Sequence, residues 1–224
     1  MPGYYDDKLA AERLRQCYEI APPRVRQYLE AEVQHVLARI CPGDRVLELG
    51  CGYGRVLLRL AGAAGLATGI DTSAASIAMG QRCLRAHSNC RLAVMDAVVL
   101  AFCEASFDAV VCIQNGISAF QVDRRMLMGE ALRVTRPEGV VLFSSYAAGF
   151  WDARLEWFEL QAAHGLLGEL DRERTRDGVI VCKDGFRATT VGPEEFAALA
   201  TSLGARAVIE EVDGSSVFCE LTSA

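Results

Sequence analysis

The sequence lacks any apolar run that approaches the roughly 20 residues needed to cross a bilayer. Its first 15 residues are charged and contain no apolar core typical of a secretory signal. Basic side chains are fewer than acidic ones, 23 against 29, and the net charge of −6 is not the basic footprint that usually drives nucleic-acid binding. We therefore expect a cytoplasmic protein with no membrane span, for which nucleic acid is not the favoured partner.

Metal-binding motifs are also missing, although the chain has nine cysteines and three histidines. No two cysteines follow the CxxC spacing, and the scattered His35, His87 and His164 give no zinc-ligand pattern. Several cysteines, among them Cys112 and Cys219, lie inside apolar stretches. This pattern is typical of reduced, buried thiols in a cytoplasmic protein, and it predicts no metal site.

Alternating strands and helices fill the first two thirds of the chain. Of the 224 residues, 51% are hydrophobic and 23% charged, which suits one globular domain. Pro22-Pro23 divides the N-terminal segment into two helices. The patterns predict strands over 45–49, 67–70, 91–95, 107–113 and 140–146, with helices over 31–40, 55–64, 73–86 and 124–134 and a turn over 136–139. This order favours an α/β fold with a doubly wound parallel sheet.

The last third has a different pattern. It predicts a hairpin over 178–190, a helix beginning at Pro193, and a closing pair of strands over 207–212 and 216–221. The charged, aromatic stretch after strand five is expected to cap the edge of the sheet. We therefore expect one domain over 1–224, divided into a helical lid (1–40), a core (41–146), a cap insertion (147–192) and a C-terminal helix with a strand pair (193–224).

A glycine loop connects the first strand to its helix. Its spacing, with Gly50, Gly52 and Gly54, is G-x-G-x-G rather than the G-x-G-x-x-G of dinucleotide-binding proteins. Glu48 precedes the loop by two residues, where an acid favours a cationic ligand and would repel a pyrophosphate. Asp71 ends the second strand, and an acid there can accept both hydroxyls of a ribose.

These segments resemble the motifs of one family. The stretch 46–56, VLELGCGYGRV, is similar to the first motif of the class I S-adenosylmethionine-dependent methyltransferases, and the stretches 69–73, 95–97, 107–111 and 133–141 resemble the motifs that follow. The resemblance is to small, stand-alone members that act on small molecules. It implies a Rossmann-like sheet of seven strands, mostly parallel with an antiparallel last strand, N-terminal helices, a small cap after strand five, and S-adenosylmethionine as cofactor.

The resemblance also implies roles for individual residues. Glu48 would lie near the ammonium of the cofactor and Asp71 would bind its ribose, with Thr72 beside it. Asp96 and the amide of Ala97 would bind the adenine. The loop residues Gly50, Cys51 and Gly52 would line the methionine part, and Gln114 and Asn115 would flank the sulfonium and face the acceptor.

The acceptor pocket is expected between the N-terminal segment and the strand ends, with the stretch 146–157 around Trp151 and Trp157 as its roof. Methyl transfer from a sulfonium can be catalysed largely by positioning, so that a general base is optional, and the sequence shows no catalytic triad. The candidate catalytic residues are Asn115, Tyr5, Tyr18 and His164. Arginines in residues 1–30 and in the insertion could hold an anionic acceptor.

Other functions remain open at this stage. They are methylation of protein or RNA, methylation of a thiol or metalloid, and binding of the cofactor without catalysis, as a partner subunit or sensor. Arg124, Arg125, Arg133 and Arg136 are clustered, but their helical spacing favours a solvated face. The segment 114–117 has neither the prolines nor the aromatic residue of enzymes that methylate flipped bases. The sequence favours a small-molecule acceptor and leaves its reacting atom and the oligomeric state open.

Overall fold

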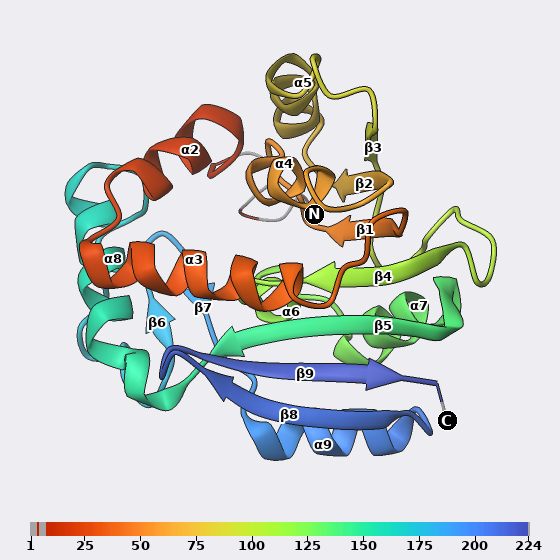
Figure 1. The fold of residues 1–224 in the computed structure, drawn as a ribbon. Coiled ribbons are helices and arrows are strands. Elements are labelled where there is room, and N and C mark those ends of the chain that lie inside the picture. Colours follow the sequence, from red (N-terminus) through yellow and green to blue (C-terminus); the bar gives the residue numbers. More distant parts are fainter. Residues whose placement is uncertain (1–3, 5–7, 224) are drawn as a thin grey trace.

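A seven-stranded sheet forms the centre of the computed structural model, which describes residues 4 and 8–223 (Figure 1). Its order is β3-β2-β1-β4-β5-β9-β8. Strand β9 pairs antiparallel with both neighbours, whereas the other strands run in one direction. The strands are β1 Arg45–Leu49, β2 Leu66–Asp71, β3 Cys90–Val94, β4 Phe107–Cys112, β5 Thr135–Tyr146, β8 Arg206–Val212 and β9 Ser216–Thr222. The predicted fold class is confirmed.

Helices cover both faces of this sheet because nearly every residue of its central strands is apolar, and consecutive residues point to opposite faces. Leu47 packs with Leu127 and Phe196 on one face, and Val46 packs with Val33 and Leu57 on the other. The helices are α2 Ala11–Glu19, α3 Pro23–Leu37, α4 Arg55–Ala61, α5 Ala74–Cys83, α6 Gly116–Ala119, α7 Arg124–Val134, α8 Trp151–Ala163 and α9 Pro193–Ser202, with a 3-10 turn η1 Ala148–Phe150.

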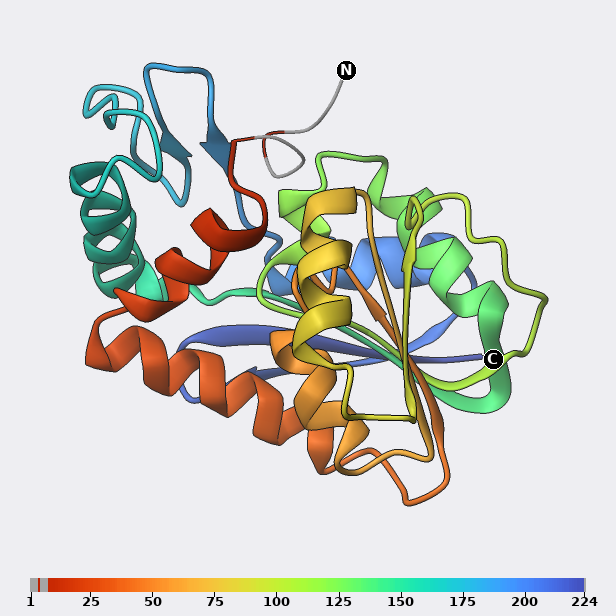
Figure 2. The ribbon, with the colours of Figure 1, turned by 90° about the horizontal axis from the view of Figure 1, so that it is seen from above.

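A third apolar cluster lies beyond the carboxyl ends of the parallel strands. It joins α2 and the first half of α3 to α8 and to the hairpin of β6 Ile180–Val181 and β7 Arg187–Ala188. Figure 2 shows these segments gathered at the same end of the sheet. The N-terminal segment and the insertion after β5, far apart in sequence, therefore make one structure over the strand ends.

Several predicted boundaries are wrong. Strand β5 begins at Thr135 rather than at residue 140, because Thr135 already pairs with Phe107 and a bulge then takes up the stretch expected as a turn. Helices α3, α4 and α5 end at Leu37, Ala61 and Cys83, each three residues earlier than predicted. These differences lie away from the carboxyl ends of β1 and β4, so they do not alter the site.

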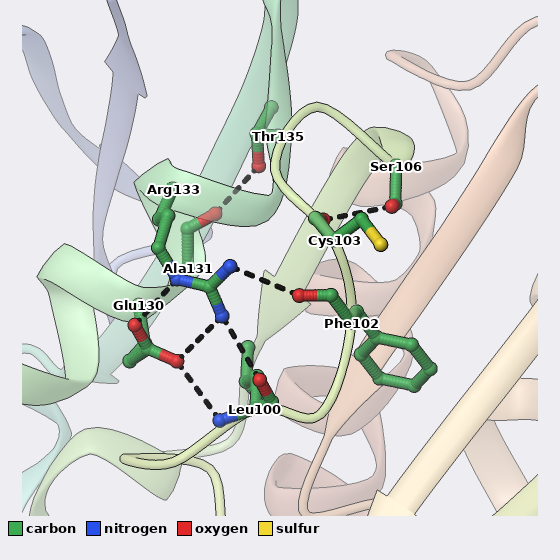
Figure 3. A network of polar contacts seen from close by, with 8 residues as sticks. All are labelled: Leu100, Phe102, Cys103, Ser106, Glu130, Ala131, Arg133 and Thr135. Carbon is green, nitrogen blue, oxygen red and sulfur yellow. Dashed lines mark hydrogen bonds and ion pairs between the residues drawn. The ribbon is translucent and has the colours of Figure 1, made fainter.

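The clustered arginines around α7 are engaged in intramolecular contacts. Arg133 donates to the carbonyls of Leu100 and Phe102, both at 2.9 Å, and forms an ion pair with Glu130, which itself accepts from the Leu100 amide at 2.8 Å (Figure 3). Arg124 and Arg136 form ion pairs with Glu195 and Asp108. The contacts of Arg133 and Glu130 hold the loop before β4 onto α7. Three of the four arginines considered for nucleic-acid binding thus form ion pairs within the protein.

All nine cysteines are free thiols, and they divide by burial. Five are buried, Cys90 is half-buried, and Cys41, Cys83 and Cys103 are exposed. Burial raises the pKa of Cys17 and Cys219 to about 12. The expectation of buried thiols thus holds for Cys17, Cys51, Cys112, Cys182 and Cys219 and is wrong for the three exposed ones.

Thiol titration of the folded protein should therefore be biphasic. We expect Cys41, Cys83 and Cys103 to react with a disulfide reagent rapidly, because they are exposed, and the five buried thiols to react only after denaturation. A stopped-flow absorbance trace with and without guanidinium measures both amplitudes. Rapid reaction of seven or more thiols before unfolding would contradict the packing described above.

Candidate active site

A cavity of about 870 Å³ opens where the parallel strands end. Its floor is formed by the carboxyl ends of β1, β2 and β4 and by the loop after β3, and its roof by α2, α3, α8 and the β6–β7 turn. Ligands of open α/β sheets bind at this edge, beside the point where the strand order reverses between β1 and β4. The cavity is within the size range of small-molecule sites.

The glycine loop forms one wall of the cavity. Gly50, Gly52 and Gly54 all have positive φ, at 75°, 53° and 86°. A Cβ atom at Gly50 would also lie 2.4 Å from the ring of Phe120, so a side chain there would collide as well as strain the backbone. The loop is held to β2 because the amides of Gly50 and Cys51 both donate to the Ile70 carbonyl at 2.9 Å.

Asp71 links the glycine loop to the start of α5. One carboxylate oxygen accepts from the Gly52 amide at 2.9 Å, and the other accepts from the Ser73 amide at 2.8 Å. Asp71 and its neighbour Thr72 line the cavity, so this carboxylate both shapes the loop and faces a ligand.

The loop after β3 supplies the next part of the wall. Asp96, Ala97 and the preceding Met95 line the cavity. One carboxylate oxygen of Asp96 accepts from the Val98 amide at 3.0 Å, which fixes the turn. The three acids that the sequence singled out thus end up around a single cavity, since Glu48 lines it too.

Glu48 is the most unusual group of the site. Its side chain is buried, with 5% exposed, and its Oε2 has no hydrogen-bond partner among the described residues. Burial raises the pKa of Glu48 to about 8; the nearby Arg55 lowers it and the charge of Asp71 raises it further. A buried carboxylate without a partner is costly, so its position on a cavity wall indicates a cationic ligand.

Arg55 and Gln114 meet beside Glu48. The Arg55 guanidinium donates to Oε1 of Gln114 at 2.5 Å and lies over the ring of Tyr18, 4.2 Å from its centre. Nε of Arg55 and Nε2 of Gln114 are buried and have no partner among the described residues. Both residues line the cavity, which therefore presents two donors in addition to the Glu48 acceptor. The sequence placed Arg55 in the loop motif but gave it no role.

The four candidate catalytic residues have different positions. Tyr18 lines the cavity. Asn115 adopts a left-handed conformation, φ 64°, which turns its side chain away to the Thr189 carbonyl and the Ser145 hydroxyl, and it does not line the cavity. His164 caps the end of α8, exposed and bonded to the Leu160 carbonyl, outside the cavity. Tyr5 lies outside the described residues.

Aromatic residues form much of the roof. Tyr146 at the end of β5 and Trp157 of α8 line the cavity and belong to the stretch predicted to shape the acceptor pocket, whereas Trp151 is not among the lining residues. Tyr28 of α3 and Phe158 of α8 also line it, and their spacing is that of ordinary core residues, so no sequence pattern separates them. No arginine of the first 30 residues or of the insertion is among the described residues that line the cavity. The arginines predicted to hold an anionic acceptor are therefore not in contact with it.

Two further features concern metal binding and membrane insertion in the part of the chain that the structure describes. No group of three or more histidine, cysteine or acidic side chains there is arranged to hold a metal ion. None of its helices combines the length and the apolar character needed to cross a membrane.

Comparison with known proteins places this site in context. Residues 46–139 match the family described as "Methyltransferase domain". The chain is 28% identical to 2-methyl-6-phytyl-1,4-hydroquinone methyltransferase of Synechocystis sp. and 32% identical to arsenite methyltransferase of Aquipseudomonas alcaligenes, over 56% and 60% of its length. These matches span only 42% and 40% of the two relatives.

A solved structure of a methyltransferase also has a similar fold. The structure is similar to a methyltransferase dependent on S-adenosylmethionine from Methanosarcina mazei, with a TM-score of 0.61, 20% identity, and coverage of 84% of this chain and 96% of the other. At this level of identity the likeness concerns the fold.

Proposed function

We propose that this chain, which carries a class I S-adenosylmethionine-dependent methyltransferase domain, transfers the methyl group of that cofactor to a small-molecule acceptor. The resemblance read from the sequence is confirmed at the level of family and fold by the domain match over residues 46–139 and by the sheet order. The activity on an acceptor is the proposal. Its two curated relatives above act, by their names, on a hydroquinone and on arsenite, which supports a small acceptor.

One observation carries the proposal, namely the buried Oε2 of Glu48 beside the glycine loop, which has no hydrogen-bond partner among the described residues. The cofactor presents an ammonium, a carboxylate and two ribose hydroxyls. Glu48 would accept from the ammonium, Asp71 from the hydroxyls, and the donors of Arg55 and Gln114 suit an oxygen of the carboxylate. Asp96 and Ala97 would hold the adenine, as the resemblance implies. The polar groups present thus fit the cofactor.

The remaining residues would act by positioning. When bound, the cofactor supplies a methyl group on a positively charged sulfur, which needs no further activation. The roof of α2 and α8 covers part of the cavity, and Trp157 joins the two helices by donating to the Cys17 carbonyl at 2.9 Å. A proton released by the acceptor would pass to solvent or to a neighbouring hydroxyl, so no dedicated base is required. A reducing, cytoplasmic compartment is part of the proposal, and the free cysteines support it.

Two experiments test cofactor binding and methyl transfer to an acceptor separately. Calorimetry should show binding of S-adenosylhomocysteine without added metal and no preference for a nicotinamide dinucleotide. Incubation with methyl-labelled cofactor and cell extract should then place the label in the small-molecule fraction rather than in protein or RNA. Label in a macromolecular fraction would overturn the small acceptor, and tight binding without any labelled product would favour a sensor or partner subunit.

A further inference from the structure

Gln161 of α8 is a buried polar residue in the roof of the cavity. Only 3% of it is exposed, and it lines the cavity in a roof that contains apolar residues such as Leu9, Leu29 and Phe158. Its carboxamide forms no hydrogen bond with any residue that the structure describes. The unpartnered polar atoms that lack accessible surface do not include those of Gln161, so its carboxamide is open to the cavity.

The orientation of Gln161 is fixed by contacts that leave its carboxamide unused. Trp157 lies one helical turn earlier on the same face of α8 and ties this helix to α2 by donating to the Cys17 carbonyl at 2.9 Å. The backbone carbonyl of Gln161 accepts from the Leu166 amide at 2.9 Å and closes the end of the helix. Burying an amide without a hydrogen bond is costly, so its place on a cavity wall indicates a polar ligand group there.

The charged groups of the cavity have other partners. Arg55 lies over the ring of Tyr18 and donates to Gln114 at 2.5 Å, and its remaining donor suits the carboxylate of the cofactor. Lys8 pairs with Asp184 at 3.5 Å. Because residues of the floor match the ammonium, carboxylate, hydroxyls and adenine of the cofactor, the carboxamide in the roof is left for the acceptor.

A carboxamide holds a carbonyl acceptor and an N–H donor side by side in one plane. The ligand group that satisfies both atoms is another donor next to an acceptor, as in an amide or a lactam. We propose that Gln161 is a specificity residue for a methyl acceptor with such an amide edge: Oε1 accepts from the N–H of the acceptor, and Nε2 donates to its carbonyl. This inference rests on the proposed function and names the class of acceptor. Molecules without this edge leave the carboxamide unpaired and bind less tightly.

Two matched probes test this class of acceptor on the protein saturated with S-adenosylhomocysteine. Benzamide has the amide edge, whereas acetophenone keeps the ring and the carbonyl but lacks the N–H. We expect calorimetry to show that benzamide binds at least fivefold more tightly than acetophenone. Equal or tighter binding of acetophenone, or no binding of benzamide, would overturn the inference.

Gln161→Met tests the residue itself, since methionine keeps the length of the side chain and removes both hydrogen-bonding atoms. The affinity for benzamide should fall at least tenfold, and the affinity for S-adenosylhomocysteine should stay within twofold. Gln16→Met makes the same change on α2, where Gln16 is exposed and does not line the cavity. This control variant should alter the affinity for benzamide less than twofold.

Thermal unfolding separates ligand binding from a structural role. The melting temperature of Gln161→Met without ligands should not fall, because the side chain makes no hydrogen bond within the described protein that could be lost. A lower melting temperature together with an unchanged affinity for benzamide would show that Gln161 is structural. Failure of the unmutated protein to bind S-adenosylhomocysteine would instead count against the proposed function, and the affinities of the variants for benzamide, measured on the free protein, would still decide the role of Gln161.

Discussion

Replacing Glu48 by glutamine is expected to weaken S-adenosylhomocysteine binding by roughly thirtyfold or more while making the free protein more stable. The loss of affinity follows because one partner of a buried, charge-assisted contact disappears, at a cost of at least about 2 kcal/mol. The gain in stability follows because the carboxylate is buried and its Oε2 has no hydrogen-bond partner among the described residues. Calorimetry and thermal unfolding of the two proteins measure both changes.

The effect of Glu48→Gln on stability should depend on pH. The pKa of Glu48 is raised to about 8 in the folded protein, so between its ordinary value and pH 8 the folded state holds a proton that the unfolded chain releases. Stability is therefore lost as pH rises through this window, and the loss is absent in Glu48→Gln. The melting temperatures of Glu48→Gln and the unmutated protein should differ little at pH 5 and most at pH 8. The difference should be about 2–4 °C for each kcal/mol of difference in the free energy of unfolding.

Cofactor binding should show the opposite trend with pH. The bound ammonium requires the ionised carboxylate, so that below pH 8 the unmutated protein releases a proton on binding. Its affinity should increase from pH 6 to about 8 and then stop rising, whereas that of Glu48→Gln should not depend on pH in this range.

Glu32→Gln is the matched control for Glu48. Burial also raises the pKa of Glu32, to about 7, but its oxygens already accept from the Ser216 hydroxyl and the Gln114 amide, both at 2.6 Å. This variant should change stability and keep the pH dependence of binding. If Glu48→Gln binds as tightly as the unmutated protein at pH 8, the assignment of Glu48 to the ammonium is wrong.

Asp71→Ala is expected to lose both cofactor affinity and stability. Loss of the acceptor for two hydroxyls should cost about 1.5–3 kcal/mol, roughly ten- to a hundredfold in affinity. The sequence alone suggested that affinity would suffer more than stability. The structure changes that expectation, because the same carboxylate holds the amides of Gly52 and Ser73, and their release should destabilise the fold by about 1–3 kcal/mol.

Asp108→Ala is the control that separates the loss of cofactor affinity from the loss of stability. Asp108 also accepts a backbone amide, from Arg45 at 2.7 Å, and forms an ion pair with Arg136, but it lies at the amino ends of β1 and β4. Asp108→Ala should therefore lower the melting temperature and leave the affinity for S-adenosylhomocysteine within twofold of normal. If Asp71→Ala also keeps its affinity, Asp71 is structural and does not bind the ribose.

The cofactor side of the site could be predicted because local chain geometry builds it. A strand, a glycine loop and a helix follow one another in sequence, so the places of Glu48 and Asp71 at the strand ends follow from the order of the elements. Asn115 shows the limit of this argument. Its position after β4 was predicted correctly, but two consecutive left-handed residues, Gln114 and Asn115, turn the chain so that the Asn115 side chain bonds to Ser145 and Thr189 instead of lining the cavity.

The sequence by itself determined the fold class, the resemblance to methyltransferases and the set of acids around the cavity, since each depends on periodicity or on spacing within a few tens of residues. It also indicated the stretch around Trp157 as a roof, but only the tertiary structure decided which residues of the roof line the cavity. Tyr28 has the spacing of a core residue on α3, and Trp157 that of a core residue on α8; what makes them line a cavity is how α2, α3 and α8 pack over the strand ends. The same packing left Oε2 of Glu48 without a hydrogen-bond partner among the described residues and directed Arg13 of the roof to the Gly165 carbonyl. Contacts between the N-terminal segment and the insertion join residues more than a hundred positions apart, so local sequence patterns do not predict them.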